Sequence, residues 1–245
     1  MSVIINVLVG LLVGLLINYF SDVLPVTRRI SRPVCSVCNQ PYTLKDYLLF
    51  GKCSNCGKKV SIRSIVVIII TIAICILLKY FPFAGLDFWA TLPILLLLGV
   101  ILVIDIEHRL VLIETSILGF VLFLIYGIIL FGLKTTLLGG LAGFLIMLVF
   151  FIFGLVFTKV IGRIRHKEID EVAFGFGDVS AGTIIGLLCG WPVVVGAIII
   201  AILAFGAYSL IYIIILLITK KYSAFSSALP FAPFLILGLI VIYYL

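Results

Sequence analysis

Long apolar runs separated by short polar segments make up most of the chain. Eight such runs can be drawn, over residues 3–20, 64–79, 88–104, 111–133, 135–161, 179–189, 193–218 and 230–245. Most are rich in Leu, Ile, Val and Phe all round, which is typical of helices embedded in lipid. The strict alternation of a membrane barrel strand is absent, so helices are the expected form. The pattern predicts an all-α polytopic membrane protein with about eight transmembrane helices.

Composition agrees with a membrane protein. The chain has 245 residues, of which 64% are hydrophobic and 11% charged, and its mean hydropathy is +1.44. A soluble domain has roughly 45–50% apolar and about 25% charged residues. We therefore relate the net charge of +7 to membrane topology and not to nucleic acid. The expected partners include membrane lipid and exclude nucleic acid.

The basic residues predict the orientation. If the polar segment 21–63 is cytoplasmic and the eight runs alternate, then of the 17 lysines and arginines only Lys79 and Lys134 fall on the outer side. This asymmetry follows the positive-inside rule. It divides the chain into a first transmembrane helix (1–20), a cytoplasmic loop (21–63) and a membrane bundle (64–245). Both termini are then outside, and Asp105 and Asp178 lie at cytoplasmic helix ends.

The sixth run is shorter than the others. About a dozen residues separate Asp178 from the Gly190-Trp191-Pro192 turn, which is roughly 17 Å of helix against a hydrocarbon core of roughly 30 Å. If Trp191 marks the outer interface, Asp178 lies below the inner membrane surface. Alternatively the helix continues through Pro192 and brings Asp178 to the surface.

The polar loop contains two CxxC pairs, Cys35 with Cys38 and Cys53 with Cys56, separated by 14 residues. Four thiolates at this spacing suit a tetrahedral Zn²⁺ without an open position, which makes the site structural. Two disulfides are the alternative, but thiols on the cytoplasmic side stay reduced. The loop is therefore expected to be a small, zinc-ribbon-like structure.

Two isolated carboxylates interrupt the apolar pattern. Asp105 follows the third run, and Asp178 ends the sequence Gly175-Phe176-Gly177-Asp178, where we expect both glycines to provide permissive dihedrals and close approach. Either aspartate alone is equally consistent with a helix cap or a turn. Together they form a candidate catalytic pair, because two adjacent carboxylates cannot both ionise, so one holds a proton while the other acts as a base.

Six short motifs follow one another along the chain. They are Gly14 to Asn18 with Leu24-Pro25, the four cysteines with Gly51-Lys52, Asp105 with His108-Arg109, Gly140 to Phe144, Gly175 to Val179 with Gly190-Trp191, and Leu229 to Leu235. In this order they resemble the type IV prepilin peptidases, which are leader peptidases of the GxGD aspartyl protease group. Ser180 is a departure, because the family usually has lysine there.

The resemblance implies a multi-pass aspartyl endopeptidase of the bacterial cytoplasmic (inner) membrane, with Asp105 and Asp178 as catalytic residues. Its substrates would be type IV prepilins or pseudopilins, cut after a glycine that ends a short basic leader. One alternative is a bifunctional enzyme that also methylates the new N-terminus, with S-adenosylmethionine as cofactor. Others are a proton- or cation-coupled transporter that uses both aspartates, and a zinc-ribbon scaffold without activity.

Overall fold

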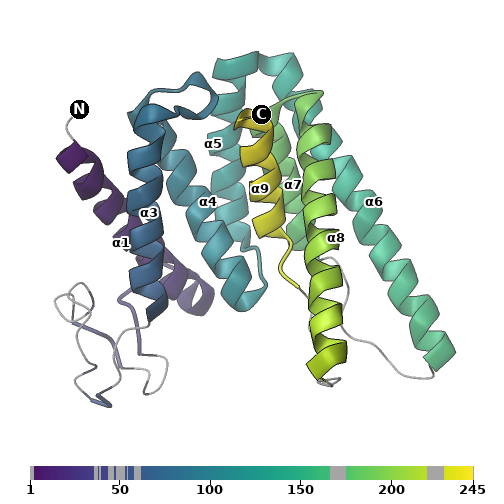
Figure 1. The fold of residues 1–245 in the computed structure, drawn as a ribbon, viewed down its shortest axis with the longest axis horizontal. Coiled ribbons are helices and arrows are strands. Elements are labelled where there is room, and N and C mark those ends of the chain that lie inside the picture. The colour runs from purple at the N-terminus through teal and green to yellow at the C-terminus, as the bar shows by residue number, and fades with distance from the viewer. Residues whose placement is uncertain are drawn as a thin grey trace. The chain divides into compact units, whose positions relative to one another are not determined.

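The computed structural model describes residues 3–35, 38, 40–43, 47, 53, 55–57, 62–165, 175–219 and 229–244, with the backbone alone over 161–165. This part of the chain contains eight α-helices, one 3-10 helix and an isolated β-bridge, but no strand (Figure 1). The helices are α1 (Val3–Thr27), α3 (Ile62–Tyr80), η1 (Phe83–Gly85), α4 (Phe88–His108), α5 (Ile113–Phe131), α6 (Leu133–Arg165), α7 (Phe176–Cys189), α8 (Val193–Thr219) and α9 (Ala232–Tyr244). The predicted all-α membrane fold is confirmed.

Six of these helices are long and apolar enough to cross a membrane, whereas α7 and α9 are shorter. The chain divides into two compact units, residues 1–104 and 105–245. Each unit is described separately.

In the first unit, α1 packs against α3 along one face of α1. A Cβ atom on Gly10 would lie 2.7 Å from Ile72 Cα, and one on Gly14 would lie 3.0 Å from Ile68 Cα. One turn further on, Asn18 Nδ2 donates a buried hydrogen bond of 2.9 Å to the carbonyl oxygen of Ser64. Small residues allow this close helix contact, and the amide side chain then joins the two helices.

The first helix is longer than expected. It continues past residue 20 to Thr27, with Pro25 inside its last turn. We predicted that this helix would end at the first polar residues. Instead, the Ser21 hydroxyl donates a hydrogen bond to the Ile17 carbonyl oxygen within the same helix. A short hydroxyl side chain is thereby accommodated in the helix and does not mark its end.

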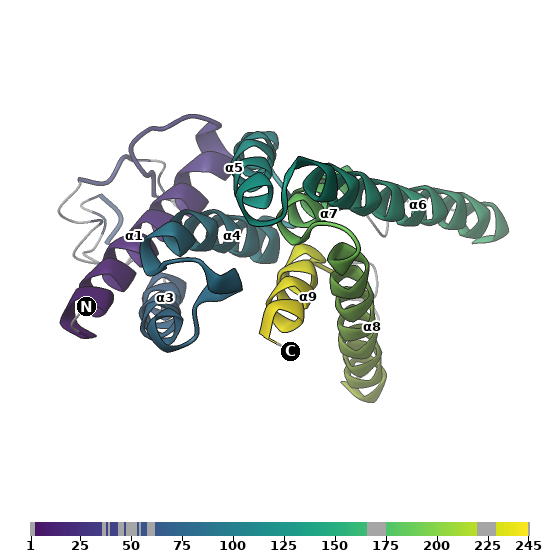
Figure 2. The same cartoon turned by 90° about the horizontal axis from the view of Figure 1, so that it is seen from above.

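In the second unit, α7 is the central helix. Nine of its 14 residues are buried, and it packs against α5, α6, α8 and α9 (Figure 2). The helix ends at Cys189, Gly190 follows with a φ of 69°, and α8 begins at Val193. The alternative of one helix continuing through Pro192 is therefore wrong, and α7 is about 21 Å long.

Glycines allow α6 to lie directly against α7. A Cβ atom on Gly139 would lie 2.4 Å from the Gly186 carbonyl oxygen, and one on Gly143 would lie 2.3 Å from that of Gly182. Contacts of this length require hydrogen in place of a side chain, as in other small-residue interfaces between membrane helices. The Gly140 to Phe144 motif thus lies in a helix–helix interface that fixes the position of α7.

Candidate active site

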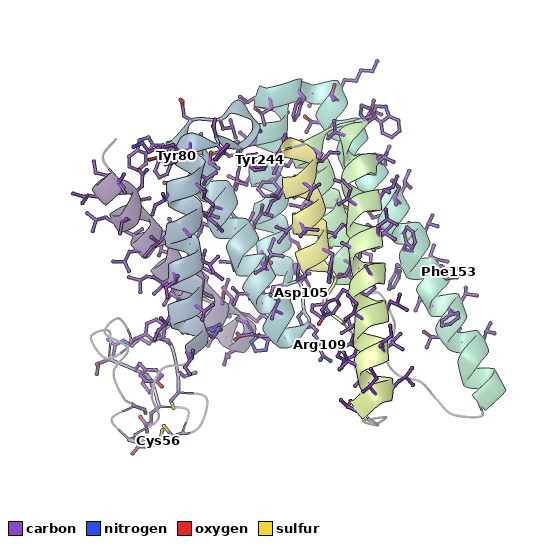
Figure 3. The ribbon with its side chains drawn as sticks, viewed as in Figure 1. Cys56, Tyr80, Asp105, Arg109, Phe153 and Tyr244 are labelled. Atoms are coloured by element: carbon purple, nitrogen blue, oxygen red, sulfur yellow. The ribbon has the colours of Figure 1, made fainter. Side chains whose placement is uncertain are left out.

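Asp105 lies in the last turn of α4 and is only 4% exposed. Its Oδ2 atom accepts a buried hydrogen bond of 3.0 Å from the backbone N–H of Ala232. Figure 3 shows Asp105 beside the first turn of α9. Asp105 therefore caps the start of a helix 127 positions later in the chain, and not the start of the helix that follows it.

The local sequence explains why Ala232 offers this N–H group. Pro230 and Pro233 flank the first helical position, and proline favours helix starts. The carbonyl oxygen of Phe231 accepts hydrogen bonds from the N–H groups of Phe234 and Leu235, at 3.0 and 3.3 Å, so Phe231 caps α9. The first N–H groups of a helix have no partner inside it, and a carboxylate near this positive end of the helix dipole is stabilised.

Asp178 lies in the first turn of α7 and is partly buried. Its Oδ2 atom accepts a hydrogen bond of 3.0 Å from the backbone N–H of Gly175. The N–H of Asp178 in turn donates to the Gly175 carbonyl oxygen at 3.0 Å. Asp178 is therefore held by its own helix, whereas Asp105 is held by a helix distant in the sequence.

The two carboxylates lie in the same unit and interact electrostatically. They come from different helices, the last turn of α4 and the first turn of α7. Each accepts one backbone N–H group. Because like charges oppose ionisation of both groups, this interaction favours a state in which one of the two carboxyls holds a proton.

The two glycines of the motif differ. A Cβ atom on Gly177 would lie 2.9 Å from the Cβ of Val111. Among the residues that the structure describes, one on Gly175 would meet the N atom of Gly177 alone, at 3.8 Å. Neither glycine has a positive φ, and φ at Gly175 is −85°. Neither glycine therefore adopts the left-handed conformation that its permissive dihedrals would allow. The expected close approach is found at Gly177, where it allows the loop after α4 to contact α7.

Ser180, where the sequence departs from the motif it resembles, lies one turn into α7. Its hydroxyl donates to the Phe176 carbonyl oxygen at 3.4 Å. This bond lies within the helix, so the serine needs no partner from another element.

The four cysteines of the polar loop come together in the first unit. Their sulfur atoms all lie within 4.8 Å of one another, and the Cys35–Cys56 and Cys38–Cys53 pairs are each 3.5 Å apart. These distances are too long for disulfides, whose sulfurs lie about 2.05 Å apart. Four sulfurs around one Zn²⁺, each about 2.3 Å from the metal, lie about 3.8 Å from one another. The cluster can therefore hold one metal ion.

Backbone hydrogen bonds lower the pKa of one of these thiols, that of Cys53. The N–H groups of Cys56 and Asn55 donate to the Cys53 sulfur and lower the pKa of its thiol. A lower pKa increases the thiolate fraction, and the thiolate is the form that binds metals. Figure 3 shows Cys56 in the loop between α1 and α3.

The same loop is fastened to both neighbouring helices. Asp22 of α1 forms an ion pair with Arg63 of α3 and accepts a hydrogen bond from the hydroxyl of Tyr47 in the loop. Burial and the adjacent Asp22 carboxylate raise the pKa of Tyr47, so this hydroxyl keeps its proton and remains a donor. Tyr47 thus connects the cysteine-containing loop to α1 and, through Asp22, to α3.

Two contributors to the site were missed from sequence. The sequence did not indicate what the Leu229 to Leu235 motif does. In the structure, its Ala232 N–H donates a hydrogen bond to the Asp105 carboxylate. The two prolines predict a helix start with unpaired N–H groups, but not which carboxylate would accept them. Val111 is an ordinary apolar residue in the sequence, and only its contact with Gly177 shows its importance.

Comparison with protein families gives one result. A model of the Type IV leader peptidase family matches residues 92–217, just over half of the chain. The matched segment contains both Asp105 and Asp178. Comparison with the curated proteins and with the solved structures gives no match.

Proposed function

Because the chain belongs to the type IV leader peptidase family, we propose that it is an aspartyl endopeptidase that cleaves the leader of type IV prepilins or pseudopilins. The proposal rests on two carboxylates of the matched segment, Asp105 and Asp178, which lie at the ends of two different helices and are each held by a backbone N–H group. A carboxylate in an apolar chain is costly and is usually functional. Here the apolar chain contains two of them, on different helices of the same unit.

The chemistry needs only the two carboxyl groups and water. The ionised carboxylate takes a proton from water as the oxygen attacks the scissile carbonyl carbon. The protonated partner donates its proton to the carbonyl oxygen, which gives a tetrahedral gem-diol. The first carboxyl, now protonated, passes the proton from water to the leaving amine as the C–N bond breaks, and the partner takes a proton back from the gem-diol as the new carboxyl group forms. General acid–base catalysis of this kind needs one protonated and one ionised group at the same pH.

We propose that both aspartates lie on the cytoplasmic side of the inner membrane and below its surface. The charge asymmetry supports the side. The length of α7 supports the depth, because about 21 Å of helix cannot cross a hydrocarbon core of roughly 30 Å. A substrate could then place its apolar helix in the membrane and its basic leader in the cytoplasm, so that the cleaved bond lies at the level of the aspartates.

The test is cleavage of a co-expressed type IV prepilin whose short basic leader ends in glycine. We expect Asp105→Asn and Asp178→Asn each to abolish the shift to mature pilin on an immunoblot, while each variant still inserts into the membrane. Asp87→Asn is the control, because Asp87 is an exposed carboxylate before α4 and should leave cleavage unchanged. Cleavage that persists in either Asp105→Asn or Asp178→Asn refutes the catalytic pair.

For the cysteine cluster we propose a structural Zn²⁺ held by Cys35, Cys38, Cys53 and Cys56. Four sulfur ligands leave no position for substrate or water, so the metal would stabilise the loop and take no part in the reaction. Metal binding supplies folding free energy to a segment too small and polar to form a core.

A further inference from the structure

The last turn of α4 does not by itself fix the Asp105 carboxylate. The helix ends at His108, and Arg109 follows with a φ of 54°. An aspartate side chain within a helix mainly adopts two staggered positions about its first bond, and they place the carboxylate in different directions. A catalytic pair requires one of these directions, so another part of the protein must select it.

The hydrogen bond from Ala232 makes that selection. It is a bond from a fixed backbone N–H to a side chain that is 4% exposed. Such a bond to an ionised carboxylate is among the stronger hydrogen bonds in proteins. Ala232 itself is 1% exposed, so this group is positioned to bind Asp105 and not a substrate.

The N–H group is fixed because α9 is fastened to α7 and α8. Tyr243 donates its hydroxyl to the Leu188 carbonyl oxygen of α7, at 2.8 Å. A Cβ atom on Gly238 would lie 2.1 Å from the Ala197 carbonyl oxygen of α8, so these two helices are in direct backbone contact. At the start of α9, the ring of Phe231 packs edge-on against Phe205 of α8, with centroids 5.2 Å apart.

These contacts form a continuous connection between the two carboxylates. Asp178 is part of α7, α9 is anchored on α7, and Asp105 is bound to the first residue of α9. We propose that Ala232 is a positioning residue, whose backbone N–H orients the Asp105 carboxylate towards Asp178, so that the C-terminal helix sets the geometry of the pair. This inference rests on the proposed peptidase function.

The experiment removes a single hydrogen-bond donor. Ala232→Pro lacks the N–H and occupies the first helical position, where proline is best tolerated. The preceding residue, Phe231, is the N-cap, and the extended backbone typical of an N-cap is compatible with a following proline. Replacing residue 232 with lactic acid, by nonsense suppression, exchanges the N–H for an ester oxygen without adding a ring. Ala232→Gly is the matched control, because it changes the side chain and keeps the donor.

The purified full-length variants are assayed with a purified type IV prepilin for kcat and KM, and their thermal unfolding is recorded. We expect the proline and lactic acid variants to lose about 10- to 100-fold in kcat with KM within about threefold, since a misplacement of about 1 Å at a catalytic group can have this effect. Ala232→Gly should stay within about threefold of the unmodified protein in both constants.

Two results overturn the inference. One is an unchanged kcat in the lactic acid variant. This result refutes the positioning role of the Ala232 N–H even if Ala232→Pro does not fold. The other is a loss in Ala232→Gly as large as that in the lactic acid variant. Cleavage that survives Asp105→Asn instead refutes the proposed peptidase function, so the two failures are distinguishable.

Discussion

Gly177→Ala should impair the site although it adds only one methyl group. The new Cβ would lie 2.9 Å from the Cβ of Val111 and 3.3 Å from its Cγ2. Carbon atoms in contact prefer about 3.5–4.0 Å, so the loop after α4 must move away from α7 by about 0.6–1.1 Å. Overpacking of this kind typically costs about 1–3 kcal/mol of stability.

The movement affects the reaction because Val111 follows Asp105 by six positions in the same short segment. A displacement of about 1 Å at a catalytic group lowers activity by up to about 100-fold. We therefore expect Gly177→Ala to lower kcat for prepilin cleavage by about 10- to 100-fold. Gly175→Ala should stay within about threefold, because its Cβ meets no described atom closer than 3.8 Å and its φ of −85° suits any residue.

The assay is steady-state cleavage of a purified prepilin by both variants in detergent, with thermal unfolding measured in parallel. A second substitution provides an internal check, since Val111→Gly removes the atom that the new methyl group meets. The double variant should recover most of the activity lost in Gly177→Ala. An active Gly177→Ala, or an inactive Gly175→Ala, would show that steric contact with Val111 is not what the motif requires.

Two further predictions concern the rest of the chain. Cys35→Ser should lose the bound metal, so that the zinc content measured by mass spectrometry falls from about one Zn²⁺ per chain to background. Cys75→Ser, which changes a buried cysteine of α3, should keep the metal. Zinc retained by Cys35→Ser would contradict the proposed site. Gly186→Val should separate α6 from α7, because its Cβ would lie 2.4 Å from the Gly139 carbonyl oxygen. We expect a lower unfolding temperature and loss of cleavage. Gly206→Val should leave both unchanged, because its Cβ meets nothing within 4 Å in the described part of the chain.

Hydropathy and turn signals predicted most of the helices because each is a local property. Apolar length identified the eight helices, and the Gly190-Trp191-Pro192 turn correctly predicted that α7 would be short. The continuation of α1 to Thr27 was not predicted, because proline and polar residues usually end a helix. Here Ser21 bonds to its own helix, and Pro25 lies in the last turn.

The parts of the site that could not be predicted depend on distant partners. Gly175 and Gly177 are equivalent in a sequence motif, and only the position of Val111 makes a side chain costly at one of them. The pairing of Asp105 with Ala232 joins residues 127 positions apart. A single sequence shows that both a carboxylate and a helix start are present, but it contains no information on which of them meet.

The same separation has a consequence during synthesis of the protein. The ribosome adds about 5–20 residues per second, so the N–H group that binds Asp105 is made roughly 6–25 s after the aspartate itself. Throughout that time α4 is complete while its buried carboxylate has no final partner. The hydrogen bond can form only after residue 232 has been synthesised, so the orientation of the Asp105 carboxylate depends on a late part of the chain. A nascent chain that stops before residue 232 would carry both aspartates and lack the group that orients the first of them.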